Sequence, residues 1–207
     1  TKIDAEKEVL VYSVSGKPIK SRSNNQQMLV DAFNKNDMVF AVGPAGTGKT
    51  YLSIALAVKS LKAKEVKKII LSRPAVEAGE KLGFLPGDMK EKIDPYLQPL
   101  YDSLEDMIPA VKLQDMVDKH IIQIAPLAFM RGRTLNDAII ILDEAQNTST
   151  AQIRMFLTRL GINSKMIITG DLTQIDLPYH QKSGLKEAVE ILNDTEGIAI
   201  VKLSQKD

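Results

Sequence analysis

The sequence predicts an α/β domain in which a mostly parallel sheet carries helices on both faces. Short β-branched runs alternate with segments of helical periodicity, an order typical of parallel strands joined by crossover helices. Some runs are apolar at every position, as in residues 139–142, which indicates central strands covered on both sides. With 207 residues, 44% of them apolar and 26% charged, the chain can form one large domain with a sizeable core.

Six runs are expected to form strands, and helices are expected between them. The strands are residues 38–42, 68–71, 121–125, 138–142, 165–169 and 198–203. The helices are residues 51–61, 152–160 and 184–192, whose apolar side chains recur at helical spacing. Residues 75–109 contain too many glycines and prolines for one long helix, so loops and short helices are expected there. Residues 1–22 are expected to form a lead-in strand or hairpin, and residues 23–207 the domain.

Composition excludes several classes of protein. A net charge of +1 gives no overall attraction to nucleic acid or anionic lipid, so binding to either would need a local patch. The absence of cysteine excludes disulfides, thiolate catalysis and zinc sites that use sulfur. No run of about 18 apolar residues exists and the first residues contain no apolar signal segment. We therefore expect a cytoplasmic protein without a membrane partner.

The strongest functional signal is a glycine-rich motif that binds phosphate. It matches G-x-x-x-x-G-K-[ST] and comprises Gly43, Pro44, Ala45, Gly46, Thr47, Gly48, Lys49 and Thr50. An apolar run precedes the motif and a helical segment beginning at Tyr51 follows it, which is the context this loop requires. Backbone N–H groups would surround phosphate oxygens, Lys49 would reach the β- and γ-phosphates, and the Thr50 hydroxyl would bind Mg²⁺. The sequence therefore predicts that these eight residues and Tyr51 bind a nucleoside triphosphate with Mg²⁺.

Two adjacent acids, Asp143 and Glu144, follow the apolar run 139–142. Downstream of a phosphate loop, an aspartate at this place holds Mg²⁺ and a neighbouring glutamate polarises the attacking water. The pair therefore predicts hydrolysis, with Lys49, Asp143 and Glu144 as catalytic residues and with Thr50 and Asp143 as Mg²⁺ ligands.

A third apolar run, residues 165–169, ends in a polar turn with Thr169, Asp171 and Gln174. If this strand lies beside the strand before the phosphate loop, the three side chains lie at the edge of the sheet where ligands bind. Gln174 would then contact the γ-phosphate or the attacking water and count among the catalytic residues. The alternative is an ordinary turn capped by Asp171.

The segment before residue 28 has two interpretations. Ser23 or Asn24 would cap a helix whose first turn is polar. Alternatively, Gln26 would recognise adenine, because an amide can pair with both the donor and the acceptor on the adenine edge.

Two arginines also have several interpretations. Arg131 follows a predicted strand, and it would lie on a solvated turn, contact the phosphate of the nucleotide, or contact the phosphate of a nucleic acid. Arg73 ends the second predicted strand, and we expect it to contact RNA. The lysine-rich face of the helix at residues 51–61 is expected to be only solvated.

The order of these motifs resembles the PhoH family of P-loop ATPases, which are related to the motor domains of superfamily-one helicases. The stretches that carry the resemblance are Asn25-Gln26, GPAGTGKT, SRPAVEAGEKLGFLPGD, PLAFMRGRTL, ILDEAQ and TGDLTQIDLP, within residues 9–207. The resemblance implies a RecA-like fold, ATP as the nucleotide, Asn25 and Gln26 near adenine, Gln174 as γ-phosphate sensor, and single-stranded RNA as a partner. Similar proteins carry a further N-terminal domain and continue into an Arg-His segment, so we expect this chain to be part of a longer protein.

Three hypotheses for the whole protein follow. The first is an ATPase that remodels RNA; because related motors close two such domains around ATP, we expect a homo-oligomer, such as a ring, that completes the site in trans. The second is a nucleotide-dependent switch with slow hydrolysis. The third, a small-molecule kinase, is disfavoured because Glu144 follows Asp143 and no arginine-rich lid follows.

Overall fold

The computed structural model describes residues 7–75 and 95–207. Six strands form one parallel sheet in the order β5-β4-β6-β7-β3-β8. In chain order, the strands are β3 (Met38–Val42), β4 (Lys68–Arg73), β5 (Ile122–Pro126), β6 (Ala138–Leu142), β7 (Lys165–Gly170) and β8 (Ile198–Lys202). All six match the runs expected from the sequence to within two residues at each end.

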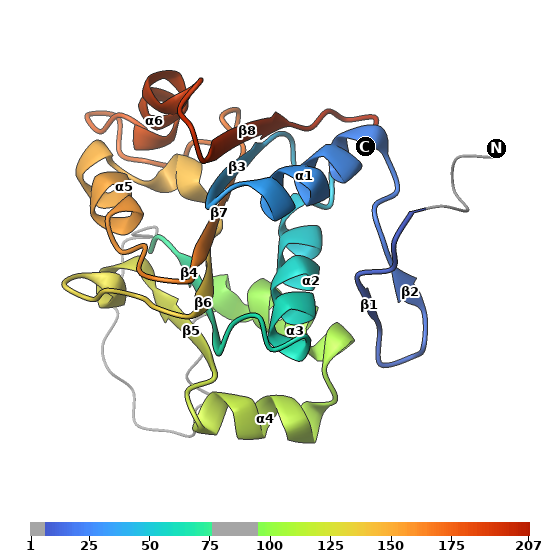
Figure 1. The fold of residues 1–207 in the computed structure, drawn as a ribbon. Helices are drawn as coiled ribbons and strands as arrows, with labels where there is room; N and C mark the ends of the chain where they lie inside the picture. The colour runs from blue at the N-terminus through green and yellow to red at the C-terminus, as the bar shows by residue number, and fades with distance from the viewer. Residues whose placement is uncertain (1–6, 76–94) are drawn as a thin grey trace.

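Helices connect these strands (Figure 1). They are α1 (Asn24–Lys35), α2 (Lys49–Lys62), α3 (Gln98–Met107), α4 (Ala110–Asp118), α5 (Thr150–Leu157) and α6 (Gly184–Leu192), with short 3-10 helices η1 (Pro95–Leu97), η2 (Leu127–Met130) and η3 (Ala145–Asn147). Helix α5 begins earlier than predicted because Ser149 caps it with a complete capping box, and it ends at Leu157 rather than at Leu160. Helix α3 lies where short helices were expected, α4 was not expected, and the predictions for residues 76–94 fall outside the described chain.

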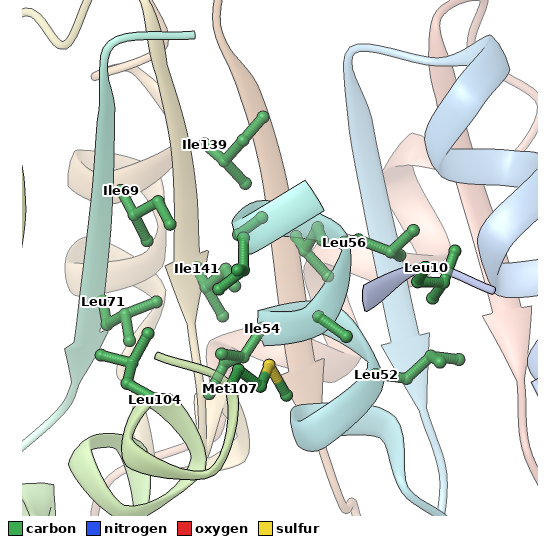
Figure 2. Packing of buried hydrophobic residues seen from close by; sticks show 14 of the residues in the cluster. Leu10, Leu52, Ile54, Leu56, Ile69, Leu71, Leu104, Met107, Ile139 and Ile141 are labelled. Carbon is green, nitrogen blue, oxygen red and sulfur yellow. The ribbon is translucent and has the colours of Figure 1, made fainter. Parts of the chain in front are cut away.

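Apolar side chains cover both faces of the sheet. Along β3, Val39 and Ala41 belong to one core cluster, whereas Met38 and Phe40 belong to the other, because successive strand residues point to opposite faces. Helices α1 to α4 contribute to the first cluster and α5 and α6 to the second. Figure 2 shows α2 packed through its leucines and isoleucine against the sheet residues of the first cluster. The predicted arrangement, a parallel sheet between two helical layers, is therefore confirmed.

The N-terminal segment forms a separate two-stranded antiparallel hairpin of β1 (Val11–Tyr12) and β2 (Pro18–Ile19). It lies apart from the main sheet in Figure 1. Its buried residues Leu10, Val11 and Ile19 nevertheless join the core cluster that contains α2. Among the described residues, no helix is both long and apolar enough to cross a membrane.

The strand order brings the three functional motifs to one edge. Strand β7 pairs in parallel with both β3 and β6, so their carboxyl ends lie side by side. The loops that leave these ends contain residues 43–48, 143–149 and 171–183. The condition stated for Thr169, Asp171 and Gln174, adjacency of their strand to the strand before the phosphate loop, is met.

Candidate functional site

The phosphate loop joins β3 to α2. Gly46 and Gly48 have φ values of 81° and 76°, a left-handed conformation that side chains other than glycine adopt at a cost. The Thr47 hydroxyl and the Lys49 ammonium both donate to the carbonyl oxygen of Pro44, each at 3.0 Å. Lys49 is almost fully buried. Hydrogen bonds from its own side chains therefore stabilise the loop, and the ammonium group of Lys49 lies inside it.

Asp143 is the most heavily engaged side chain at this edge. Its carboxylate is 1% exposed. Oδ1 accepts from the Thr50 hydroxyl at 2.7 Å and from the Thr169 hydroxyl at 2.5 Å, while Oδ2 accepts from Arg73 Nε at 2.8 Å and pairs with Arg73 Nη2 at 2.7 Å. The carboxylate thus joins the phosphate loop, β7 and β4.

Arg73 lies inside the site. Its side chain is 14% exposed, and besides Asp143 it binds the Tyr96 carbonyl oxygen through Nη1 at 2.6 Å. The nearest Glu144 oxygen is 4.0 Å from Nη2. This arrangement does not support the interpretation of Arg73 as an RNA contact, because the guanidinium already binds Asp143 and the Tyr96 carbonyl oxygen.

Glu144 has an unusual backbone conformation. Its φ of 56° and ψ of 37° lie in the left-handed region, which costs energy for a residue with a side chain and recurs at functional sites. The side chain is 43% exposed, and Oε2 accepts a hydrogen bond from Gln146 Nε2 at 2.5 Å. One carboxylate oxygen is therefore held in place while the group stays open to solvent.

Gln146 is a site residue that sequence reasoning missed. Its fully buried amide donates to Glu144 and, at 3.3 Å, to the carbonyl oxygen of Gln174, and it accepts from the backbone N–H of Asp171 at 3.1 Å. The signal in the sequence was its place two residues after Glu144. One amide thus connects the glutamate to the turn after β7. The Gln174 side chain itself is exposed, and its contact with phosphate stays a prediction.

Asp171 has a role in its own turn and faces the phosphate loop. Its carboxylate accepts from the Thr173 backbone N–H at 2.9 Å and from the Thr173 hydroxyl at 2.6 Å. Burial alone would raise the pKa of Asp171, but these bonds, the charge of Lys49 and the N–H of Ala45 together lower the pKa below its usual value. Asp171 therefore caps its own turn through Thr173 and also lies next to the phosphate loop.

Gln26 connects α1 to the phosphate loop. Its amide donates to the carbonyl oxygen of Thr47 at 2.9 Å and accepts from the backbone N–H of Arg22 at 2.7 Å. Ser23 caps the helix by accepting from the Gln26 N–H, as the first interpretation of this segment proposed. A Cβ atom at Gly48 would lie 3.0 Å from this amide, which explains a glycine there. Among the described residues, the second N–H of the Gln26 amide has no acceptor, and adenine recognition by Gln26 stays a prediction.

Asn25 and Tyr51, also predicted to bind nucleotide, have partners within the chain. Asn25 donates to the Asp207 carboxylate at 2.9 Å. The Tyr51 hydroxyl donates to the carboxylate of Asp106 on α3. Burial, followed by this hydrogen bond and the charge of Asp106, raises the pKa of Tyr51 to about 12. The structure therefore places both residues near the loop without assigning them a nucleotide contact.

Arg131 is not brought together with the other predicted site residues. It is exposed and follows β5 and η2 at one edge of the sheet. Strands β4, β6 and β7 separate β5 from β3, which corresponds to about 19 Å at about 4.8 Å per strand. A contact between Arg131 and the nucleotide of its own chain is therefore disfavoured.

The family follows from comparison of the whole chain with known proteins. A family model described as "PhoH-like protein" matches residues 18–207. The chain belongs to the PhoH family. It is 58% identical over 200 residues to the PhoH-like protein of Bacillus subtilis, covering 97% of this chain and 63% of that protein. It is 45% identical over 192 residues to Protein PhoH of Escherichia coli K12, covering 92% of this chain and 54% of the relative. The PhoH-family chain thus spans less than two thirds of these relatives.

A solved structure shows the same fold at low identity. The SWI2/SNF2 ATPase core of Sulfolobus solfataricus, in complex with double-stranded DNA, matches with a TM-score of 0.51 and 14% identity. The match covers 88% of the PhoH-family chain and 43% of the other. This match and the six-stranded parallel sheet of the described residues confirm the predicted RecA-like fold. The family match and the phosphate-loop motif identify the chain as a nucleotide-binding P-loop NTPase domain.

Proposed function

We propose that this PhoH-family protein hydrolyses ATP to ADP and phosphate with Mg²⁺ and couples hydrolysis to single-stranded RNA. One observation carries the proposal of hydrolysis: a buried aspartate joined to the phosphate loop stands next to a glutamate whose carboxylate is oriented but open to solvent. The aspartate is Asp143, which accepts a hydrogen bond from Thr50 of the phosphate-binding motif, and the glutamate is Glu144, which Gln146 orients. A binding module without turnover has no need for an oriented, solvent-open glutamate.

The residues around Asp143 fit Mg²⁺. The Thr50 hydroxyl and the Asp143 carboxylate are 2.7 Å apart, and both are oxygen ligands of the kind that Mg²⁺ prefers. When bound, Mg²⁺ supplies positive charge that neutralises charge developing on the phosphate oxygens. Thr169 donates to the same carboxylate oxygen and so fixes its orientation.

The other residues of the chain divide the remaining tasks. Lys49 and the backbone N–H groups at the start of α2 bind the phosphates. Glu144 accepts the proton of the attacking water, because a carboxylate fixed at Oε2 by Gln146 retains Oε1 for this purpose. Gln146 also donates to the backbone carbonyl oxygen of Gln174, which supports Gln174 as the residue that senses the γ-phosphate.

A homo-oligomer belongs to the same proposal. Motors related to this family close a second domain around ATP, and the described residues of this chain form one such domain. Arg131, about four strand positions from its own phosphate loop, does not complete its own site. A second copy of the chain would supply the missing groups.

One observation favours the alternative of a nucleotide-dependent switch. Arg73 binds both Asp143 and the carbonyl oxygen of Tyr96, which lies in η1. A cation that binds Asp143 would compete with Arg73 for the carboxylate, and a displaced Arg73 would no longer hold η1. In this case hydrolysis would be slow and would only end the ATP-bound state.

The test is phosphate release from ATP and Mg²⁺, measured with and without single-stranded RNA at one fixed low salt concentration. Glu144→Gln should lower the rate by about 100-fold or more, since loss of a general base costs about that much. Glu190→Gln, an exposed glutamate on α6, is the matched control. A Glu144→Gln variant that binds ATP and retains the full rate would refute the assignment, and ATP binding with negligible turnover by the unmodified protein would favour the switch.

A further inference from the structure

Arginines are concentrated in two segments of the chain that contain no acidic residue. The chain has six arginines, of which Arg131 and Arg133 lie in residues 126–136 and Arg154 and Arg159 in residues 145–164. Neither segment contains aspartate or glutamate. The first segment forms η2 and the turn after it, the second contains α5, and η2 packs on α5. A chain with a net charge of +1 thus carries a locally basic surface.

A groove separates the turn after η2 from α5. It has a volume of about 550 Å³, and Arg131, Arg154 and Arg159 line it together with the apolar side chains of Ala151 and Met155. Arg131 and Arg154 are exposed. The groove therefore combines cationic side chains with an apolar floor, which is the composition of a surface that binds a polyanion with apolar groups.

These arginines have no acidic partner within the described residues. Within residues 7–75 and 95–207, the ion pairs are formed by residues other than these arginines. Arg159 donates to the Thr158 hydroxyl at 3.0 Å through Nη2, but its buried Nε has no hydrogen-bond partner in this part of the chain. A buried guanidinium N–H without a partner is costly, and Arg159 is one of the side chains that line the groove.

We propose that this groove binds the phosphate backbone of a single-stranded nucleic acid, with a base stacked on Phe129. Phe129 lies on η2, two residues before Arg131, and is 58% exposed. Arginine binds phosphate oxygens through two parallel N–H groups, and the exposed ring of Phe129 offers a stacking surface that a base within a duplex does not reach. The proposal rests on the proposed function, because it locates the nucleic acid that the ATPase acts on.

The position of α5 connects this groove to the ATP site. Helix α5 follows η3, and η3 contains Gln146, which binds Glu144 and the turn after β7. Ser149 caps the helix start, and the Gly184 N–H donates to the Thr148 carbonyl oxygen at 2.8 Å. A nucleic acid bound along α5 therefore changes the position of η3, the segment that orients Glu144 through Gln146. By thermodynamic reciprocity, ATP would change the affinity of the groove by the same factor.

The experiment measures binding of short labelled single-stranded RNA, the same sequence as DNA, and the RNA duplex, by fluorescence anisotropy at several salt concentrations. The variant is Arg131→Gln combined with Arg154→Gln, and Lys62→Gln combined with Lys112→Gln, two exposed lysines, is the control of equal charge. In the arginine variant the slope of log affinity against log salt should fall by about 1.4, because each lost phosphate contact contributes about 0.7. The lysine control should keep the slope.

Phe129 gives an independent readout. Phe129→Ala should lower the affinity roughly 10-fold while leaving the salt slope unchanged, because stacking of one base is worth about 5-fold to 150-fold in affinity and displaces no counterions. Phe129→Tyr should restore binding. Preference for RNA or for DNA in the single-stranded arms would identify the source of the phosphate backbone, and either preference supports the site.

Three results would overturn the proposal. One is an unchanged affinity and slope in the arginine variant, and another is equal affinity for the duplex. The third is a wild-type protein that binds ATP but no single-stranded nucleic acid, together with an arginine variant that differs from it only in the mass measured by light scattering. The groove would then be an interface between copies of the chain. Binding that follows these expectations in a protein without phosphate release would leave the groove assigned and refute the proposed hydrolysis.

Discussion

Replacing Arg73 by glutamine would remove the positive charge from a buried carboxylate. Asp143 is 1% exposed and Arg73 14%, and two guanidinium nitrogens lie within 2.8 Å of the same Oδ2. The variant would leave Asp143 in place with the hydroxyls of Thr50 and Thr169 as its only donors among residues 7–75 and 95–207. The Tyr96 carbonyl oxygen would also lose its hydrogen bond from Nη1.

The expected loss of stability follows from the burial of this pair. Removing one partner of a buried ion pair costs about 3–5 kcal/mol, because the remaining charge has no compensation. Since two hydroxyls still donate to Asp143, we expect the lower end, about 3 kcal/mol. For a domain of this size each kcal/mol lowers the melting temperature by about 2–4 °C, so Arg73→Gln should melt about 6–12 °C lower.

The assay is urea unfolding and thermal melting of four proteins: wild type, Arg73→Gln, Arg73→Gln with Asp143→Asn, and Arg154→Gln. Asp143→Asn should recover a large part of the loss, because it removes the uncompensated charge. Arg154→Gln, an exposed arginine, should change stability by less than about 0.5 kcal/mol. A melting temperature of Arg73→Gln within about 2 °C of wild type would refute the reasoning, as would a double variant no more stable than the single one.

Two further predictions concern the turn after β7 and the start of α5. Because the pKa of Asp171 lies below its usual value, its charge stabilises the folded protein above the unfolded pKa, and this stabilisation is lost as pH falls through the folded pKa. Asp171→Asn should therefore be less stable than wild type by a constant amount above about pH 4, and the difference should shrink at lower pH. Urea midpoints across this range test it, and a difference that persists in acid would contradict it. Ser149→Ala should cost about 1 kcal/mol in the same assay because it removes the α5 cap, whereas an unchanged midpoint would mean that the capping box contributes nothing.

The sequence predicted the strands well because most of the sheet is covered on both sides. Residues 138–142 are uniformly apolar and all buried, so composition alone identifies them. The phosphate loop was equally clear, since its glycines and Lys49 serve a local structure set by the loop itself. Helix α5 was displaced in the prediction because its apolar period continues past Leu157, where the structure ends the helix.

The partners of Asp143 could not be predicted in the same way. Arg73 and Thr169 lie 70 and 26 residues from Asp143, and they meet only because β4 and β7 flank β6. Periodicity within a segment contains no information on which strands become neighbours. For the same reason Arg73 was assigned to RNA from its place at a strand end, and the role of Gln146 was not recognised.

The order of strands also has a consequence for synthesis of the protein on the ribosome. In the part of the chain that the structure describes, strand β3, which leads into the phosphate loop, pairs only with β7 and β8, and these begin at residues 165 and 198. At about 5–20 residues per second, roughly 8 to 30 seconds pass between the emergence of β3 and that of β8. Throughout most of that time both edges of an apolar strand lack their native neighbours, which exposes them to wrong pairing. A bound nucleotide cannot stabilise the nascent chain in this interval, because the edge of the sheet that contains the phosphate loop has not yet been assembled.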